Sequence, residues 1–258
     1  MNRIIDMFEG LKARGKKALI GYLTAGDPDL KTSERNIRLA LDHGLDLLEL
    51  GIPFSDPTAD GPAIQAAGQR ALASGISVRR ILDLAARLRQ DYPATPIILF
   101  SYVNPLFRYG YAKLCRDAIK AGIDGFLLVD LPFEESDELR RLMWEHGLMF
   151  IQLIAPTTSP ERARRLLAKA DGFIYYIMVK GVTGARTGKT ANVRGHLAMI
   201  RACTQAPIAV GFGIGTAQQA RDAARQADAV VVGSALVQAA HEGRLATRVR
   251  TLARAVHS

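Results

Sequence analysis

The sequence lacks both a long apolar run and an apolar leader. Its most apolar windows, such as residues 229–237, fall well short of the roughly 20 residues that a membrane-spanning helix requires. The first fifteen residues carry charged side chains at close intervals, which leaves no apolar core for a signal peptide. We therefore expect a cytoplasmic protein that has no membrane partner.

Cysteine is scarce, and histidine is absent from the places where chemistry is expected. The two cysteines, Cys115 and Cys203, show no CxxC spacing, so we expect reduced core residues and neither a disulfide framework nor a zinc site. All five histidines fall in or near helical segments, so none is available at a strand end to ligate a metal or to activate a nucleophile. They are His43, His146, His196, His241 and His257. The sequence therefore predicts no metal site.

Acidic residues are outnumbered by basic ones, 25 against 34, which gives a net charge of +9. A balance of this sign raises the question of nucleic-acid binding. The basic residues are, however, spread along helix-like segments and are not gathered into one tract with interleaved aromatic residues. We expect solvated helix faces and no nucleic-acid partner, and the purpose of the excess charge has no explanation in the sequence.

Short apolar runs alternate with longer amphipathic segments from one end of the chain to the other. Eight such units use nearly the whole length and leave residues 1–15 for a leading helix. We predict an α/β fold, a (β/α)8 TIM barrel with an extra N-terminal helix, as a single domain over residues 1–258. A doubly wound open sheet is the rival, but no GxGxxG opens the first helix and no linker is present. The expected strands are 18–24, 46–51, 97–103, 125–130, 149–155, 173–179, 207–212 and 229–232.

Glu49 stands at the end of the second expected strand, where a barrel places its catalytic groups. The period of two makes its side chain point the same way as Leu47 and Gly51, into the barrel. Burying a carboxylate without a partner is costly, and a raised pKa at such a position is what a general acid or base requires. A salt-bridged structural Glu is the alternative, and the strand-end position favours catalysis.

The loop that follows, residues 53–62, is dense in proline, aspartate and glycine. Its prolines stiffen it, and its final Gly-Pro pair marks where a helix can begin. Asp56 and Asp60 each suit a turn or a helix N-cap when considered alone. On an ordered loop over the barrel mouth, however, a second carboxylate such as Asp60 can act opposite Glu49 on a bound substrate.

Glycine-rich segments follow the last three expected strands. The segment 180–190 is expected to form an active-site lid, with a disordered surface loop as the alternative. Residues 211–215 and 233–235 place glycines at two consecutive strand ends, where backbone N–H groups and the start of a helix can bind an anion. Such barrels bind phosphate at this place, so the sequence predicts a phosphorylated substrate.

These motifs together resemble the tryptophan synthase alpha chain family. The resemblance rests on residues 48–57 and 60–65, on Gly-Val-Thr-Gly at 181–184 and on Val-Gly-Phe-Gly-Ile at 210–214, and it extends over essentially the whole chain. The segment after the second strand is highly specific to the family. The phosphate half is not, because many phosphate-binding barrels share it.

The resemblance implies a lyase that cleaves indole-3-glycerol phosphate by a retro-aldol reaction into indole and glyceraldehyde 3-phosphate, in tryptophan biosynthesis. No cofactor is implied in this chain. The implied partner is a beta chain that carries pyridoxal phosphate and receives the indole, in an α2β2 heterotetramer. Proton transfer is placed on Glu49, and Asp60 is expected to face the indole N–H.

The resemblance also implies the residues that bind substrate. Indole is expected between apolar and aromatic groups near the strand ends, for which a place in the barrel core is the alternative: Tyr22, Ile64, Phe100, Leu127 and Tyr175. Phosphate is expected at Gly184, Phe212, Gly213, Gly233 and Ser234, and Thr183 in the lid. The family often has Ser or Arg where this chain has Met178-Val179-Lys180, which leaves lid motion and signalling to the beta chain open.

Three other functions share parts of this pattern. One is a stand-alone lyase that releases free indole. Another is an aldolase in which Lys180 forms a Schiff base on another sugar phosphate, although the parity of Lys180 is opposite to that of Tyr175. The last is a barrel that only activates its partner, which the presence of both Glu49 and Asp60 argues against.

Overall fold

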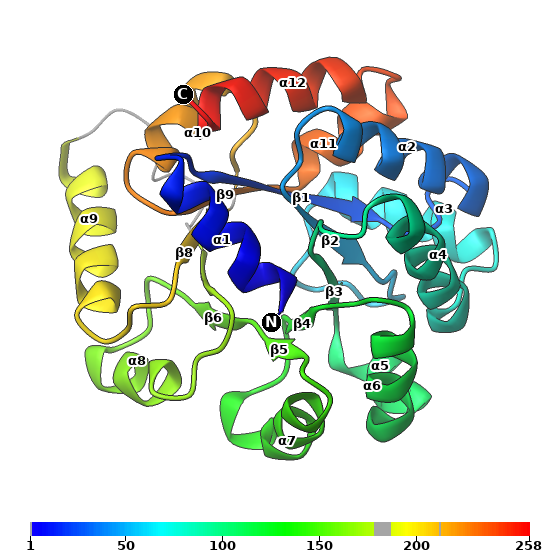
Figure 1. Cartoon of the computed structure of the whole chain (residues 1–258), viewed down its shortest axis with the longest axis horizontal. Coiled ribbons are helices and arrows are strands. Elements are labelled where there is room, and N and C mark those ends of the chain that lie inside the picture. Colours follow the sequence, from blue (N-terminus) through cyan, green and yellow to red (C-terminus); the bar gives the residue numbers. More distant parts are fainter. Residues whose placement is uncertain (1, 178–186, 212) are drawn as a thin grey trace.

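Parallel strands and helices alternate along the chain in the computed structural model, which describes residues 2–177, 187–211 and 213–258. The strands are β1 (Ala18–Thr24), β2 (Leu47–Gly51), β3 (Ile97–Ser101), β4 (Gly125–Leu128), β5 (Met149–Phe150), β6 (Gln152–Ile154), β7 (Ile174–Ile177), β8 (Ile208–Gly211) and β9 (Ala229–Val232). The helices are α1 (Arg3–Ala13), α2 (Leu30–Asp42), α3 (Pro62–Ala73), α4 (Val78–Asp91), α5 (Val103–Tyr109), α6 (Tyr111–Lys120), the short 3-10 helix Phe133–Glu135, α7 (Asp137–Glu145), α8 (Pro160–Leu167), α9 (Thr187–Arg201), α10 (Ala217–Ala224), α11 (Ser234–His241) and α12 (Leu245–Val256). The helices surround the strands (Figure 1).

The sheet closes on itself at Ile151. In the strand order β5-β4-β3-β2-β1-β9-β8-β7-β6, the two outermost strands are consecutive in sequence and are separated by Ile151 alone. β5 pairs with β4 and β6 pairs with β7, and the N–H of Ile151 donates to the carbonyl of Phe126 at 2.9 Å. The predicted (β/α)8 barrel is confirmed. Its fifth strand, expected as one run over 149–155, is split because the chain changes partner at Ile151.

Several expected strands are longer than the observed ones at their carboxyl ends. The strand expected over 97–103 ends at Ser101, because α5 begins at Val103. The strand expected over 125–130 ends at Leu128. Residues such as Tyr102 therefore lie just beyond the strand ends, at the mouth of the barrel, where the site is expected.

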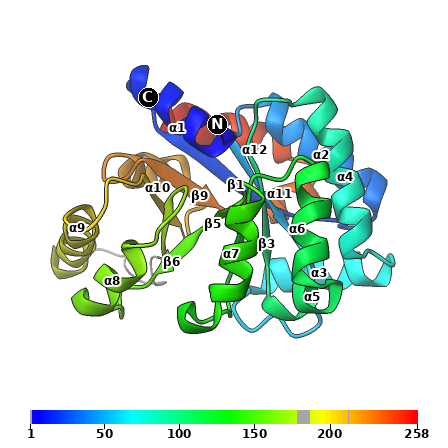
Figure 2. The ribbon, with the colours of Figure 1, turned by 60° about the horizontal axis from the view of Figure 1, so that its bottom comes forward.

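The leading helix α1 covers the N-terminal end of the barrel (Figure 1). Its N-cap, Asn2, accepts a hydrogen bond from the N–H of Ile4, and the helix buries Ile4, Phe8 and Leu11. The ring of Phe8 lies 5.7 Å from that of Phe173 (centroid to centroid), at the start of the β7 segment. Figure 2 shows α1 at one end of the barrel and α3 and α5 toward the other. Access for a substrate is therefore expected from the carboxyl ends of the strands.

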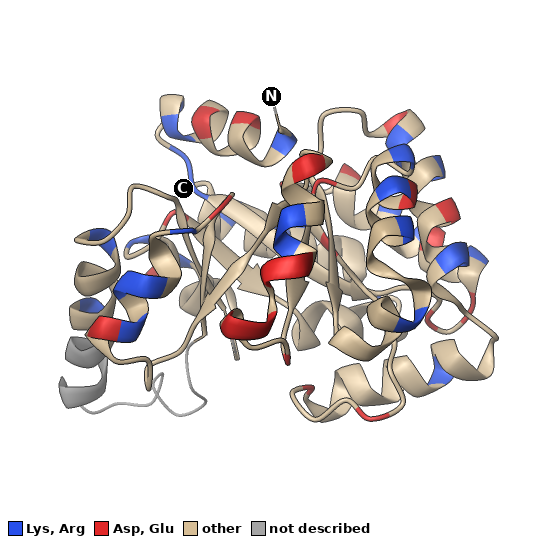
Figure 3. Cartoon of the chain, turned by 90° about the horizontal axis from the view of Figure 1, so that it is seen from below, with Lys and Arg blue, Asp and Glu red and all other residues tan. Residues whose placement is uncertain are grey.

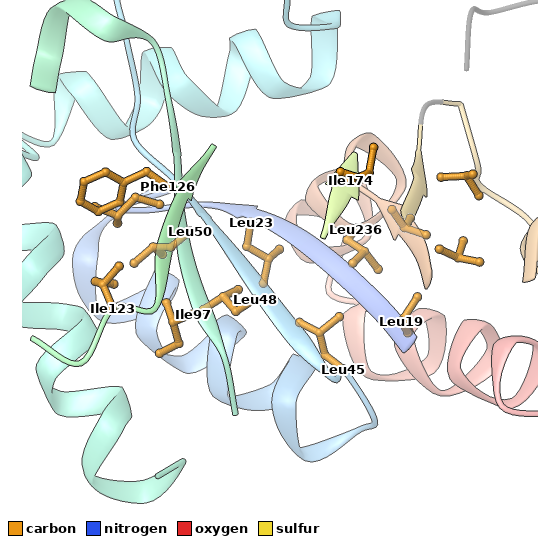
Figure 4. Packing of buried hydrophobic residues seen from close by; sticks show 14 of the residues in the cluster. Leu19, Leu23, Leu45, Leu48, Leu50, Ile97, Ile123, Phe126, Ile174 and Leu236 are labelled. Carbon is orange, nitrogen blue, oxygen red and sulfur yellow. The ribbon is translucent and has the colours of Figure 1, made fainter. Parts of the chain in front are cut away.

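Alternate residues of each strand belong to two separate cores. Leu48 and Leu50 of β2 face the helices in the larger cluster (Figure 4), whereas Leu47 belongs to the cluster inside the barrel. Each fully buried Leu of this kind stabilises the fold by about 1.5 to 3 kcal/mol. The same alternation places Glu49 on the inner face with Leu47.

Aspartates immediately before three strands organise the N-terminal end of the barrel. Each accepts a hydrogen bond from the backbone N–H at or near the start of a neighbouring strand: Asp46 from Leu19 at 2.7 Å, Asp124 from Ile97 at 2.8 Å and Asp228 from Ile208 at 3.0 Å. Each also lies against a basic side chain, respectively His257, Arg89 and Arg201. Carboxylates at this end therefore serve strand alignment.

Most of the basic residues that the structure describes lie on the outer helices, as the sequence indicates. Figure 3, seen from below, shows Lys and Arg distributed over several helices with Asp and Glu among them. In the part of the chain that the structure describes, no helix has the length and apolar character needed to cross a bilayer.

Candidate active site

Glu49 is a buried carboxyl on the inner face of β2. Its side chain is 1% exposed, and among the atoms that the structure describes its Oε1 has no hydrogen-bond partner. Tyr22 of β1 and Ile98 of β3 are its register partners. Burial raises the pKa of this carboxyl from its ordinary value to about 8, so it carries a proton at neutral pH. An inward-pointing, unpaired carboxyl with this pKa suits proton transfer.

Two buried tyrosines face Glu49 from β1 and β7. Burial is the largest cause of the raised pKa of Tyr22 and of Tyr175, and the charge of Glu49 adds to both. Strand-end glycines make room for these rings. A Cβ on Gly51 would collide with the Tyr22 ring, and one on Gly211 would lie 2.6 Å from the Tyr175 hydroxyl. Gly211, which we expected to serve an anion, therefore also has a packing role in the pocket.

Asp60 approaches the same space from the loop between β2 and α3. As expected, that helix begins at Pro62, with Gly61 as its N-cap. The Asp60 carboxyl is half-buried, and burial raises its pKa to about 6, against the opposing effect of the Tyr102 hydroxyl. The charge of Asp60, like that of Glu49, contributes to the raised pKa of Tyr22, so both carboxyls lie near that tyrosine. Asp56 on the same loop is exposed.

Tyr102 is a site residue that the sequence reasoning missed. Its hydroxyl accepts a hydrogen bond from the N–H of Ala59 at 2.8 Å, and its ring lies 5.2 Å from that of Phe54 (centroid to centroid). It thereby anchors the loop that carries Asp60 to the end of β3. The signal was its place near a strand end, but the strand expected over 97–103 included it as an ordinary strand residue.

The five residues expected to hold indole lie in two clusters that share Phe100. Tyr22 and Phe100 pack edge to face, with ring centroids 5.1 Å apart, and Ile64 packs with them. Phe100 also packs against the inner cluster, which contains Leu127 and Tyr175. Leu127 is the register partner of Phe100 on β4. The structure thus connects all five through Phe100, and Tyr22 is also the register partner of Glu49.

Gly233 and Ser234, two of the residues expected to bind phosphate, lie next to the cluster of Tyr22 and Ile64 and to the loop of Asp60. A Cβ on Gly233 would lie 3.6 Å from Ile64 Cδ1 and 3.6 Å from Tyr22 Cβ. Helix α11 begins at Ser234, and a Cβ on Gly61 would lie 3.7 Å from the Ser234 hydroxyl oxygen. The loop that carries Asp60 therefore lies next to Ser234 of the expected phosphate site.

Some predicted residues lie outside the described part of the chain. They are Thr183, Gly184, Phe212 and Met178-Val179-Lys180. Gly213 is described and has a φ of +73°, which a residue with a side chain rarely adopts. Within the described ranges, no three or more His, Cys, Asp or Glu side chains form a group that could hold a metal ion. Of the two cysteines, Cys115 is buried as expected, whereas Cys203 is only partly so.

A family model described as tryptophan synthase alpha chain matches residues 8–257. The chain belongs to the tryptophan synthase alpha chain family. A tryptophan synthase alpha chain from Gluconacetobacter diazotrophicus is 48% identical over 237 residues, which cover 92% of this chain and 86% of that relative. Another from Geobacter sulfurreducens is 46% identical over 263 residues and covers 99% of both chains. In a crystal structure of tryptophan synthase from M. tuberculosis, a chain 32% identical superposes with a TM-score of 0.91 and full coverage of both chains.

Membership of the tryptophan synthase alpha chain family defines the activity. The chain is a lyase that catalyses the alpha reaction, the cleavage of indole-3-glycerol phosphate, in tryptophan biosynthesis. The family also implies a beta chain as its partner. The resemblance seen in the sequence is thereby confirmed.

Proposed function

We propose that Glu49 transfers the protons of this cleavage and that Asp60 stabilises the charge that develops on the indole ring. The observation that carries the proposal is the buried Glu49 carboxyl, unpaired at Oε1 and on the inner face of β2 among the apolar side chains of the barrel interior. With a pKa of about 8 it is protonated at neutral pH, whereas Asp60, with a pKa of about 6, is mostly ionised. The two carboxyls therefore start the reaction in opposite states.

The protons balance over the cleavage. Glu49 donates its proton to indole C3, and the ring becomes a cation whose N–H is stabilised by the Asp60 carboxylate. The bond from C3 to the glycerol chain then breaks and its electron pair returns to the ring. The neighbouring hydroxyl becomes the aldehyde carbonyl and gives its proton to the Glu49 carboxylate. Indole and glyceraldehyde 3-phosphate leave, and Glu49 is again protonated.

Substitution of Glu49 by Gln tests this assignment. The amide keeps the shape of the carboxyl but cannot shuttle the proton, so indole release should fall by about 10² to 10⁴. Asp56→Asn is a matched control on an exposed acid of the neighbouring loop. Near-normal turnover in Glu49→Gln, measured as indole released from indole-3-glycerol phosphate, would overturn the proposal.

We also propose the finer points of assembly and setting. They are an α2β2 heterotetramer, pyridoxal phosphate only in the beta chain, a single domain over residues 1–258, a cytoplasmic location and no nucleic-acid or membrane partner. Support comes from the beta partner that the family implies. Light scattering of the chain with and without a beta chain gives the stoichiometry. If the beta chain neither binds nor accelerates indole formation, a stand-alone lyase is the better description.

The Schiff-base alternative has a separate test. An aldolase of that class forms an imine with its substrate, which borohydride reduces to a stable adduct. We expect no label on Lys180 after borohydride treatment with substrate present. A labelled Lys180 would replace the proposal of Glu49 catalysis.

A further inference from the structure

Helix α12 contacts the elements that form both halves of the expected phosphate site. One half is the turn Gly213–Thr216 after β8, which leads into α10. The other is Gly233 and Ser234 after β9, which lead into α11. Helix α12 packs against both α10 and α11. From α12, Arg248 Nη1 donates a hydrogen bond to the carbonyl oxygen of Gly215 at 2.9 Å.

The turn Gly213–Thr216 is also held from its other side. The Gln219 Oε1 atom accepts hydrogen bonds from the N–H of Gly215 at 2.9 Å and of Thr216 at 3.1 Å. The Thr216 hydroxyl accepts from the N–H of Gln219 at 3.2 Å, which completes a capping box. Since two N–H groups of the turn are already engaged, the part of the turn that remains for an anion is the part before Gly215, where Gly213 lies.

We propose that Arg248 is a positioning residue that fixes this turn so that the Gly213 N–H faces the phosphate of the substrate. The inference rests on the proposed function and on the phosphate site that the sequence predicts at Gly213, Gly233 and Ser234. An arginine suits the task because its planar guanidinium, half-buried between α12 and the turn, loses little freedom when it forms the bond. It touches the backbone of the turn and acts on the substrate only through it.

Arg248→Met tests the proposal against Arg250→Met, which removes the same charge from an exposed position of the same helix. Glycerol 3-phosphate probes the phosphate half by calorimetry, and indole probes the apolar half. Arg248→Met should weaken glycerol 3-phosphate binding about tenfold, the scale of one lost charge-assisted hydrogen bond. The KM for indole-3-glycerol phosphate should rise by a similar factor, with kcat within about twofold and indole affinity unchanged.

Two further variants separate positioning from general loosening. Arg248→Lys keeps the charge and an N–H donor for the Gly215 carbonyl and should restore much of the phosphate affinity. Gln219→Met releases the turn from the other side and should reproduce the loss. Equal behaviour of the Arg248→Met and Arg250→Met variants, or a parallel loss of indole and glycerol 3-phosphate affinity, would refute the role. Near-normal indole release by Glu49→Gln would instead refute the proposed function and leave this inference standing, since the binding ratio of the Arg248 and Arg250 variants is measured without turnover.

Discussion

At the N-terminal end of the barrel, Asp124 is 2% exposed and bonds to Arg3, Arg89 and the N–H of Ile97. At the carboxyl end, Glu49 is buried to the same degree, yet its Oε1 has no partner in the part of the chain that the structure describes. A buried carboxylate with cations and N–H donors around it holds the structure together. A buried carboxyl without them is kept protonated by its surroundings and is free to exchange that proton with a ligand.

The largest loss of stability expected from this contrast is at the N-terminal end. Asp124→Ala removes the carboxylate that accepts from Arg89, itself largely buried, and from the N–H of Ile97, and it leaves the Arg89 charge with neutral carbonyl acceptors alone. The free energy of unfolding should fall by about 3 to 5 kcal/mol, as when one partner of a buried pair is removed. Denaturant titration measures the loss. A fall below about 1 kcal/mol would mean that the pairing does not stabilise the barrel.

At Glu49, by contrast, substitution is expected to increase the stability of the fold. Its folded pKa, about 8, lies above the unfolded value near 4.5, so stability is fully present below the unfolded pKa and is lost as pH rises through the folded pKa. Glu49→Gln removes this pH-dependent loss of stability, because the amide does not ionise. At pH 9 the variant should be more stable than the unmodified chain by up to about 5 kcal/mol, because the proton affinity of Glu49 differs by about 3.5 powers of ten between the folded and unfolded states, at about 1.4 kcal/mol for each.

The two unfolding curves of this pair should approach each other to within about 1 kcal/mol near pH 5, because Glu49 is then protonated in the folded state and pH 5 is only slightly above its unfolded pKa. Asp124→Ala provides the contrast, since it should be less stable than the unmodified chain at both pH values. A Glu49→Gln variant that is no more stable at pH 9 would show that the carboxyl has a partner in solution.

The sequence contained enough to find Glu49 but not its neighbour Tyr102. The orientation of Glu49 follows from a local rule, the alternation along a strand, so five residues of sequence decide it. Tyr102 depends on where β3 ends and on which loop N–H its hydroxyl meets, and both are set by tertiary contacts far along the chain. The split of the fifth strand at Ile151 has the same origin, because a change of pairing partner leaves no mark on hydrophobic alternation.

A smaller loss of stability is expected from substitution of Gly51, because the Tyr22 ring occupies the space that a side chain would need there. A Cβ there displaces the Tyr22 ring from its edge-to-face contact with Phe100. Gly51→Ala should cost about 1 to 3 kcal/mol of stability, the usual range for overpacking, and should raise the KM for substrate. Gly68→Ala is the matched control, because its Cβ meets nothing nearer than Pro53 Cβ at 4.0 Å. Equal behaviour of the two variants would remove the packing role of Gly51.

The smallest expected effect is a shift of the acidic limb of the pH profile of kcat/KM. With Asp60 required ionised and Glu49 required protonated, kcat/KM should rise near pH 6 and fall near pH 8. The Tyr102 hydroxyl lowers the pKa of Asp60, so Tyr102→Phe should move the acidic limb to higher pH and leave the alkaline limb in place. Tyr109→Phe, which loses a hydroxyl bonded to Asp117 on the outer helices, should move neither limb. A shift of both limbs in Tyr102→Phe would show that the two carboxyls titrate as a coupled pair, and the contrast between them would then have to be drawn for the pair as a unit.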